Sequence, residues 1–196
     1  MLDYAGVATF AASGALMAAE RRQDVVTFVF FAAITGVGGG TLRDLLIGAP
    51  VFWVTNPGYA IVCASVGVAI FASRGRGLPK RALLWLDAAG LCVYAVVGAA
   101  KAQAWGINPV IAVVMGVLTA TFGGVIRDVL AGEPSVLLRR ELYVTPAIAS
   151  ASIFVLLAAL HAPVVWASGA GVALGFAVRA GAIAAGWRLP VFTPKK

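Results

Sequence analysis

The chain has 196 residues, of which 61% are hydrophobic and only 12% are charged. A soluble domain of this length leaves much of its surface in water and cannot bury so much apolar area, so the composition predicts a membrane protein. The net charge of +7 does not indicate nucleic-acid binding, because the basic residues fall mainly in the short loops between apolar segments.

Seven apolar segments follow one another, separated by charged, proline-rich or glycine-rich breaks. A helix needs about 20 apolar residues to cross the hydrocarbon core of a bilayer. The segments are Leu2–Ala19, Val25–Ile47, Pro57–Ser73, Leu83–Gln103, Pro109–Leu130, Leu142–Leu160 and Val164–Ala185. The connections are too short for a soluble domain, so we predict an all-α integral membrane fold with a single transmembrane domain over residues 1–196.

Basic residues divide unequally between the two sets of loops that seven crossings create. One set holds little beyond Lys101. The other set holds Arg21, Arg22, Arg74, Arg76, Lys80, Arg81, Arg139, Arg140, Arg188, Lys195 and Lys196. Because cytoplasmic loops carry an excess of Lys and Arg, this asymmetry predicts an external N-terminus and a cytoplasmic C-terminus.

The residues that most often carry catalysis or bind metals are few and scattered. Cys63 and Cys92 lie inside apolar segments without a CxxC partner, and His161 has no cluster of ligands around it. The sequence contains no Ser-His or Cys-His set and no phosphate-binding loop attached to a strand. We therefore expect neither an enzyme nor a bound cofactor.

The sequence repeats itself with an offset of 84 residues, so that Arg43-Asp44 recurs as Arg127-Asp128. The same offset aligns Asp3/Asp87, Gly6/Gly90, Gly14/Gly98, Thr35/Thr119, Gly39/Gly123, Gly40/Gly124, Gly48/Gly132, Pro50/Pro134 and Tyr59/Tyr143. Each copy holds three predicted spans, an odd number, so the second copy enters the membrane from the opposite side. We predict two inverted three-helix repeats, residues 1–78 and 83–161, plus a seventh transmembrane helix over 164–185, a plan typical of transport proteins.

Glycines interrupt the second and fifth predicted spans at matching depths, at Gly38–Gly40 and at Gly123 and Gly124. Each glycine weakens a helix by about 1 kcal/mol relative to alanine. A bend there would free backbone carbonyls, which are hard ligands suited to transient K⁺ or Na⁺, beside a water-lined path. The alternative is close helix packing, which the spacing of Gly36 and Gly40 favours.

The two Arg-Asp pairs lie near the ends of these glycine-rich spans. An unpaired arginine in the membrane is costly, and adjacent residues on a helix point in different directions. We therefore expect each arginine to pair with the aspartate that begins its repeat, Arg43 with Asp3 outside and Arg127 with Asp87 inside. The alternative is that the Arg-Asp pairs only anchor helix ends at the membrane interface.

These ion pairs would leave Asp44 and Asp128 as a surplus carboxylate at each mouth of a path. A net negative charge at a mouth concentrates cations and repels anions. Thr35 and Thr119 either add hydroxyl groups to the path or bond back to their own helices.

The motifs GVGGGTLRD (residues 36–44) and TFGGVIRD (residues 121–128), set in two three-helix halves plus a seventh helix, resemble the prokaryotic trimeric intracellular cation (TRIC) channels, a family also described as glycine transporters. The resemblance implies a homotrimer in a prokaryotic plasma membrane. It also implies one potassium-preferring, sodium-permeable pore per protomer between the repeats. Residues that it places at the pore or its gating network are Gly38, Gly39, Gly40, Gly123, Gly124, Arg43, Asp44, Arg127 and Asp128.

One position departs from the symmetry of these motifs, because Phe122 stands where the first copy has Gly38. A phenylalanine there predicts a hydrophobic constriction and two unequal half-paths.

A monovalent-cation channel is the leading interpretation. A secondary transporter of a small zwitterion such as glycine, held at the membrane midplane by broken helices, is the alternative, and a non-conducting membrane scaffold is the third. The expected partners are monovalent cations and membrane lipids.

Overall fold

The computed structural model describes residues 2–74, 81–135, 137 and 142–187. Their regular structure is entirely helical. The helices are α1 (Leu2–Glu20), α2 (Val25–Leu46), α3 (Phe52–Thr55), α4 (Gly58–Ser73), α5 (Ala82–Ala104), α6 (Pro109–Leu130), α7 (Val144–Ala159) and α8 (Val164–Ala185).

The long helices coincide with the predicted apolar segments, with ends that differ by no more than two residues. Among the described residues, α2, α5, α6 and α8 are long and apolar enough to cross a membrane, and α4 and α7 are shorter apolar helices. The chain is therefore an all-helical membrane protein. Helix α3, a single turn between α2 and α4, was not predicted from the sequence.

Several helix ends carry recognisable caps. The Asp24 carboxylate accepts a hydrogen bond from the Thr27 backbone N–H at 2.8 Å and caps the start of α2, which lowers the pKa of Asp24. Asn108 caps α6 in the same way by accepting from the Val110 N–H. Helix α8 ends at Gly186, whose positive φ of 68° suits glycine at this position.

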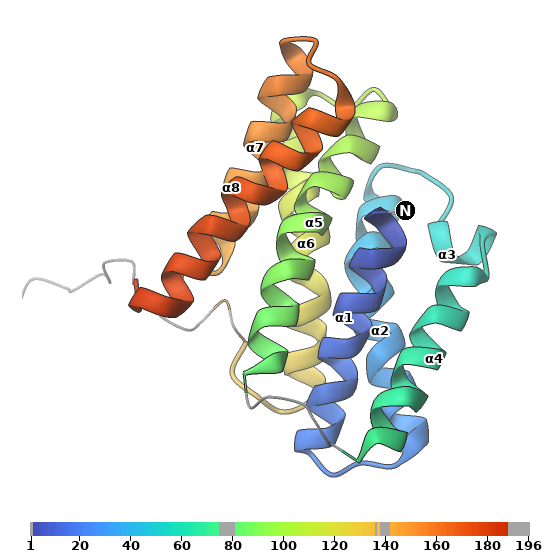
Figure 1. Ribbon diagram of the computed structural model, residues 1–196. Helices are drawn as coiled ribbons and strands as arrows, with labels where there is room; N and C mark the ends of the chain where they lie inside the picture. The colour runs from blue at the N-terminus through green and yellow to red at the C-terminus, as the bar shows by residue number, and fades with distance from the viewer. Residues whose placement is uncertain (1, 75–80, 136, 138–141, 188–196) are drawn as a thin grey trace, which may run out of the picture.

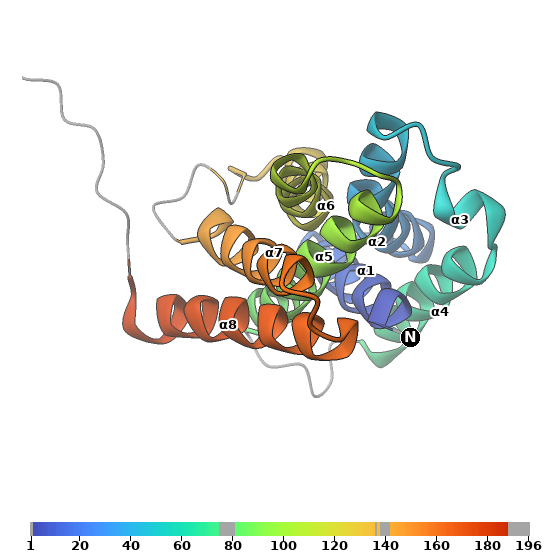
Figure 2. The ribbon, with the colours of Figure 1, turned by 90° about the horizontal axis from the view of Figure 1, so that it is seen from above.

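Helices α1, α2, α5 and α6 form the centre of the bundle, with α3 and α4 on one side and α7 and α8 on the other (Figure 2). Helix α1 packs against α5, and α2 packs against α6. In Figure 1, α1 runs downward while α5 runs upward, and α2 and α6 are likewise opposed. The two halves of the chain therefore meet at two antiparallel helix pairs.

The described basic loop residues gather at one end of the bundle. Arg21 and Arg22 follow α1, Arg74 follows α4 and Arg81 precedes α5, and these helix ends lie together at the bottom of Figure 1. Lys101 lies near the opposite end of α5. The other basic loop residues, Arg76, Lys80, Arg139, Arg140, Arg188, Lys195 and Lys196, lie outside the described residues.

Candidate functional site

Helices α2 and α6 cross in backbone contact at their glycines. A Cβ atom added to Gly39 would lie 2.1 Å from the backbone oxygen of Thr119, and one added to Gly123 would lie 2.4 Å from that of Thr35. The two contacts are related by the offset of 84 residues found in the sequence. Only residues without a side chain allow the two helices to approach so closely at both points.

The expected interruption of the helices at these glycines is not found. Helix α2 is continuous through Gly38–Gly40, and α6 is continuous through Gly123 and Gly124. None of these glycines has a positive φ. The glycines pack closely, the alternative that the Gly36/Gly40 spacing favoured. A transient cation site at their carbonyls stays a prediction.

The two threonines beside the crossing pack inward against the first helix of each repeat. A Cβ added to Gly14 would lie 2.6 Å from the Thr35 hydroxyl oxygen, and one added to Gly98 would lie 2.5 Å from that of Thr119. The Thr119 hydroxyl donates to the Met115 carbonyl on its own helix at 2.6 Å. The Thr35 hydroxyl is buried and has no hydrogen-bond partner among the described residues.

The remaining glycine positions differ in how much room surrounds them. A Cβ added to Gly38 would first meet the end of the Ile126 side chain, at 3.2 Å. Gly38 and Phe122 are both half-buried, in contrast to the fully buried Gly39 and Gly123. This face of the crossing is thus the more open one.

One polar cluster surrounds Arg127 near the C-terminal end of α6. The Arg127 guanidinium contacts the Asp87 carboxylate at 2.7 Å and the Asp128 carboxylate at 2.8 Å, and all three side chains are buried. Arg127 also donates to the hydroxyl of Ser13 on α1. The predicted pairing of Arg127 with Asp87 is confirmed.

A second cluster surrounds Asp44 near the C-terminal end of α2. The buried Asp44 carboxylate contacts the Arg43 guanidinium and the Lys101 ammonium, both at 2.8 Å. It also accepts a hydrogen bond from the Phe52 backbone N–H at 2.9 Å, which fixes the start of α3. Lys101 arrives from α5, and its side chain is 27% exposed.

The predicted pair of Arg43 and Asp3 is not found among the described residues. Asp3 instead accepts a hydrogen bond from the Tyr59 hydroxyl at 3.1 Å. Arg43 pairs with its neighbour Asp44, as Arg127 does with Asp128. The expectation that adjacent residues do not pair is wrong, because the arginine side chain is long enough to turn back onto the neighbouring carboxylate.

These contacts also correct the charge expected around Asp44. Asp44 is not a surplus carboxylate, since Lys101 and Arg43 both contact it. Asp128 contacts Arg127, whose guanidinium also contacts Asp87. The buried guanidinium of Arg179 on α8 lies 5.3 Å from the centre of the Tyr143 ring.

Three residues of these clusters were not singled out from the sequence as site residues. Ser13 is a small residue in an apolar helix and carries no pattern that distinguishes it. Arg179 donates to the Leu142 carbonyl at 2.9 Å and is fully buried, and an arginine within a predicted span is itself a signal of a functional or pairing role. Lys101 is conspicuous as the basic residue that stands apart from the others.

The described residues contain no group of three or more His, Cys, Asp or Glu side chains able to hold a metal ion. What they contain is a pair of antiparallel central helices in backbone contact, with a buried charge cluster towards each end. A membrane protein keeps buried charges of this kind mainly along pathways for ions or substrates. Fold and site together define a membrane transport protein.

Comparison with known proteins identifies the family. A family model described as "Glycine transporter" matches residues 1–74 and 84–159. The UPF0126 inner membrane protein YadS of Escherichia coli is 43% identical over 150 residues, which cover 75% of this chain and 72% of YadS. A UPF0126 membrane protein of Deinococcus radiodurans is 38% identical over 167 residues, 83% of this chain and 77% of that protein.

Solved structures agree with this assignment. A TRIC trimeric intracellular cation channel orthologue from Rhodobacter sphaeroides is 48% identical, with a TM-score of 0.91 over 95% of this chain and 97% of that chain. A prokaryotic TRIC channel solved in 0.5 M KCl is 28% identical, with a TM-score of 0.87 over 96% of each chain. The protein belongs to the TRIC channel family, which is not a family of enzymes.

Proposed function

We propose that the protein is a monovalent-cation channel that prefers potassium and admits sodium. The observation that carries the proposal is the match to a TRIC cation channel orthologue at 48% identity over 95% of the chain. The buried charge clusters near the C-terminal ends of α2 and of α6 support it, because ionisable residues kept inside a membrane protein mark pathways for ions. The homotrimer and the prokaryotic inner membrane are part of the proposal and rest on the relatives' descriptions.

The proposed arrangement in the membrane has seven crossing helices. Helices α1, α2 and α4 form the first repeat, α5, α6 and α7 form the inverted second repeat, and α8 follows as the seventh. The two stretches matched by the family model, residues 1–74 and 84–159, coincide with the proposed repeats, and the opposed directions of α1 and α5 support the inversion (Figure 1). The end of the bundle with Arg21, Arg22, Arg74 and Arg81 is the proposed cytoplasmic end.

The proposed pore of each protomer runs between the repeats along α2 and α6. Its narrowest part is the crossing of Gly39 and Gly123, and the half-buried Gly38 and Phe122 shape the path beside that crossing. The Arg127 cluster forms the inner entrance and the Asp44 cluster the outer one. Because the crossing is in backbone contact, conduction requires α2 and α6 to move apart or an ion to pass beside them.

Lys101 distinguishes the two proposed entrances. Position 17, which corresponds to Lys101 by the offset of 84 residues, is a methionine. Among the described residues, a lysine therefore contacts the aspartate of the Arg-Asp pair only at the outer entrance, where Lys101 contacts Asp44. Its ammonium occupies the place on Asp44 that a permeating cation would take, so we propose that Lys101 competes with ions there.

A transporter of glycine is the second candidate, and the description of the matching family favours it. The two functions separate in proteoliposomes that contain the purified protein. A channel releases potassium down its gradient without a substrate, and labelled glycine does not accumulate inside. Saturable glycine uptake together with an absence of substrate-independent potassium flux would reject the channel in favour of the transporter.

A further inference from the structure

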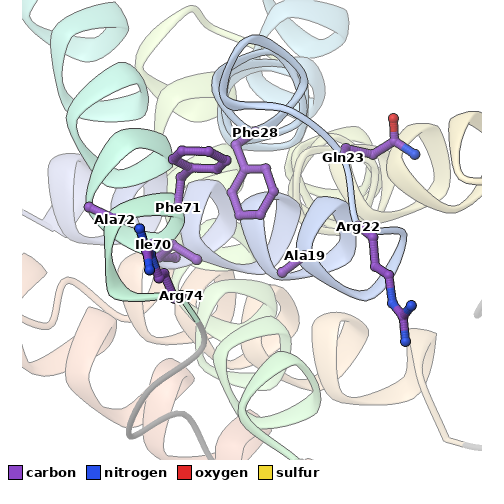
Figure 3. Close-up of a pocket in the computed structure, with 8 residues that line it drawn as sticks. All are labelled: Ala19, Arg22, Gln23, Phe28, Ile70, Phe71, Ala72 and Arg74. Carbon is purple, nitrogen blue, oxygen red and sulfur yellow. The ribbon is translucent and has the colours of Figure 1, made fainter.

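A pocket of about 620 Å³ opens at the end of the bundle where the arginines gather (Figure 3). It lies between the α1–α2 turn and the C-terminal end of α4. Its apolar wall is formed by Phe28, Ile70 and Phe71, and the rings of Phe28 and Phe71 meet edge to face with centroids 5.2 Å apart. The wall belongs to the last turn of α4 and the first turn of α2, next to the ends of these helices.

Two exposed arginines, Arg22 and Arg74, also line this pocket and stand on opposite sides of the two rings in Figure 3. Neither has an ion-pair partner among the described residues. The neighbouring Arg21, in contrast, is paired with Glu133. An arginine without an ion-pair partner among the described residues therefore stands on each side of the apolar wall.

The backbone at these two arginines is unusual. Arg22 has a φ of 53° and Arg74 a φ of 50°, so both lie in the left-handed region that favours glycine. A glycine would adopt either conformation without strain. Both positions instead carry an arginine. This indicates that the guanidinium group has a role that offsets the strain of the left-handed backbone.

We propose that this pocket binds an anionic phospholipid. Guanidinium groups bind phosphate oxygens with strong, often bidentate hydrogen bonds. Anionic lipids are drawn to basic residues next to membrane-spanning helices. The headgroup phosphate lies between Arg22 and Arg74, and an acyl chain lies along Phe28, Ile70 and Phe71. The proposal depends on the protein's place in a membrane and does not depend on what it conducts.

The test is lipid binding to the purified full-length protein, measured by native mass spectrometry with dioleoyl-phosphatidylglycerol and, separately, dioleoyl-phosphatidylcholine. We expect the anionic lipid to bind more tightly than the zwitterionic one. Arg22→Gly and Arg74→Gly remove the guanidinium groups while relaxing the backbone, so the lipid-free variants are expected to unfold at the same temperature as the wild type or a higher one. Each is expected to weaken phosphatidylglycerol binding about fivefold.

Two further measurements make the test specific. Arg81→Gln removes a charge from the same end of the bundle but not from the pocket, and is expected to leave the affinity unchanged. Phe71→Ala, in the apolar wall, is expected to weaken lipid binding. The proposal would be overturned if the two lipids bound equally well. It would also be overturned if the variant carrying both Arg22→Gly and Arg74→Gly kept the wild-type affinity, or if millimolar inorganic phosphate displaced the lipid completely.

Discussion

Replacing Gly39 by alanine is expected to destabilise the protein, although alanine is the better helix former. The added Cβ would lie 2.1 Å from the Thr119 backbone oxygen, where an unstrained contact needs about 3.4 Å, so α2 and α6 must separate by about 1 Å. The added Cβ would meet backbone atoms of Thr119, so no flexible side chain can move aside to relieve the clash. Overpacking of this kind costs about 1–3 kcal/mol, and the middle of that range, about 2 kcal/mol, exceeds the gain of about 1 kcal/mol from helix propensity.

A matched control lies one residue away. Gly38→Ala would bring its Cβ to 3.2 Å from the Cδ1 atom of Ile126, the end of a flexible side chain. It carries the same gain in helix propensity without the backbone clash, so its stability is expected to equal or exceed that of the wild type. Gly123→Ala, which would place its Cβ 2.4 Å from the Thr35 oxygen, is expected to behave like Gly39→Ala.

The assay is thermal unfolding of the purified variants in one detergent, followed by circular dichroism. The Tm of Gly39→Ala and of Gly123→Ala is expected to fall below that of Gly38→Ala. The double variant at Gly39 and Gly123 is expected to lose less than the sum of the single losses, because one separation of the helices relieves both clashes. If Gly39→Ala melts at or above the temperature of Gly38→Ala, the two helices are not in backbone contact.

Three further changes test the charge clusters and the cap of α2. Asp87→Asn removes one partner of the buried Arg127 and is expected to cost about 3 kcal/mol of stability; a Tm equal to that of the wild type would show that the pair is dispensable. Lys101→Met removes one of the two cations that contact the Asp44 carboxylate and is expected to raise single-channel potassium conductance at low ionic strength. An unchanged or lower conductance would refute the proposed competition. The folded-state pKa of Asp24 is lowered by hydrogen bonds from Thr27, so its contribution to stability is complete above the unfolded-state pKa and is lost as the pH falls through the folded-state pKa. The amount by which the Tm of the wild type exceeds that of Asp24→Asn is therefore expected to shrink below about pH 4. A difference in Tm that stays constant with pH would contradict this account.

The positions of the long helices were predictable because each is a long apolar run between polar breaks, and a membrane leaves few other solutions for such a run. The pairing of Arg127 with Asp87 was predictable because the repeat places an aspartate and an arginine at corresponding helix ends. The short helix α3 was not predictable, since its start depends on a hydrogen bond from the Phe52 backbone N–H to the carboxylate of Asp44, eight positions earlier.

The partners of Arg43 and the role of the glycines depend on packing that no local pattern encodes. Lys101 reaches Asp44 across 57 positions of sequence because α5 lies near the end of α2. The motif around Gly39 is compatible both with a broken helix and with a close crossing. Only the position of Thr119 on the facing helix decides between them.

The central claim is that this chain conducts cations, and single-channel recording from purified protein in planar bilayers tests it most directly. Under a tenfold gradient of KCl, the account predicts discrete openings whose current reverses near the potassium equilibrium potential, about 59 mV in magnitude. Current that reverses near the chloride equilibrium potential, or a silent bilayer from protein that takes up glycine in liposomes, would contradict it.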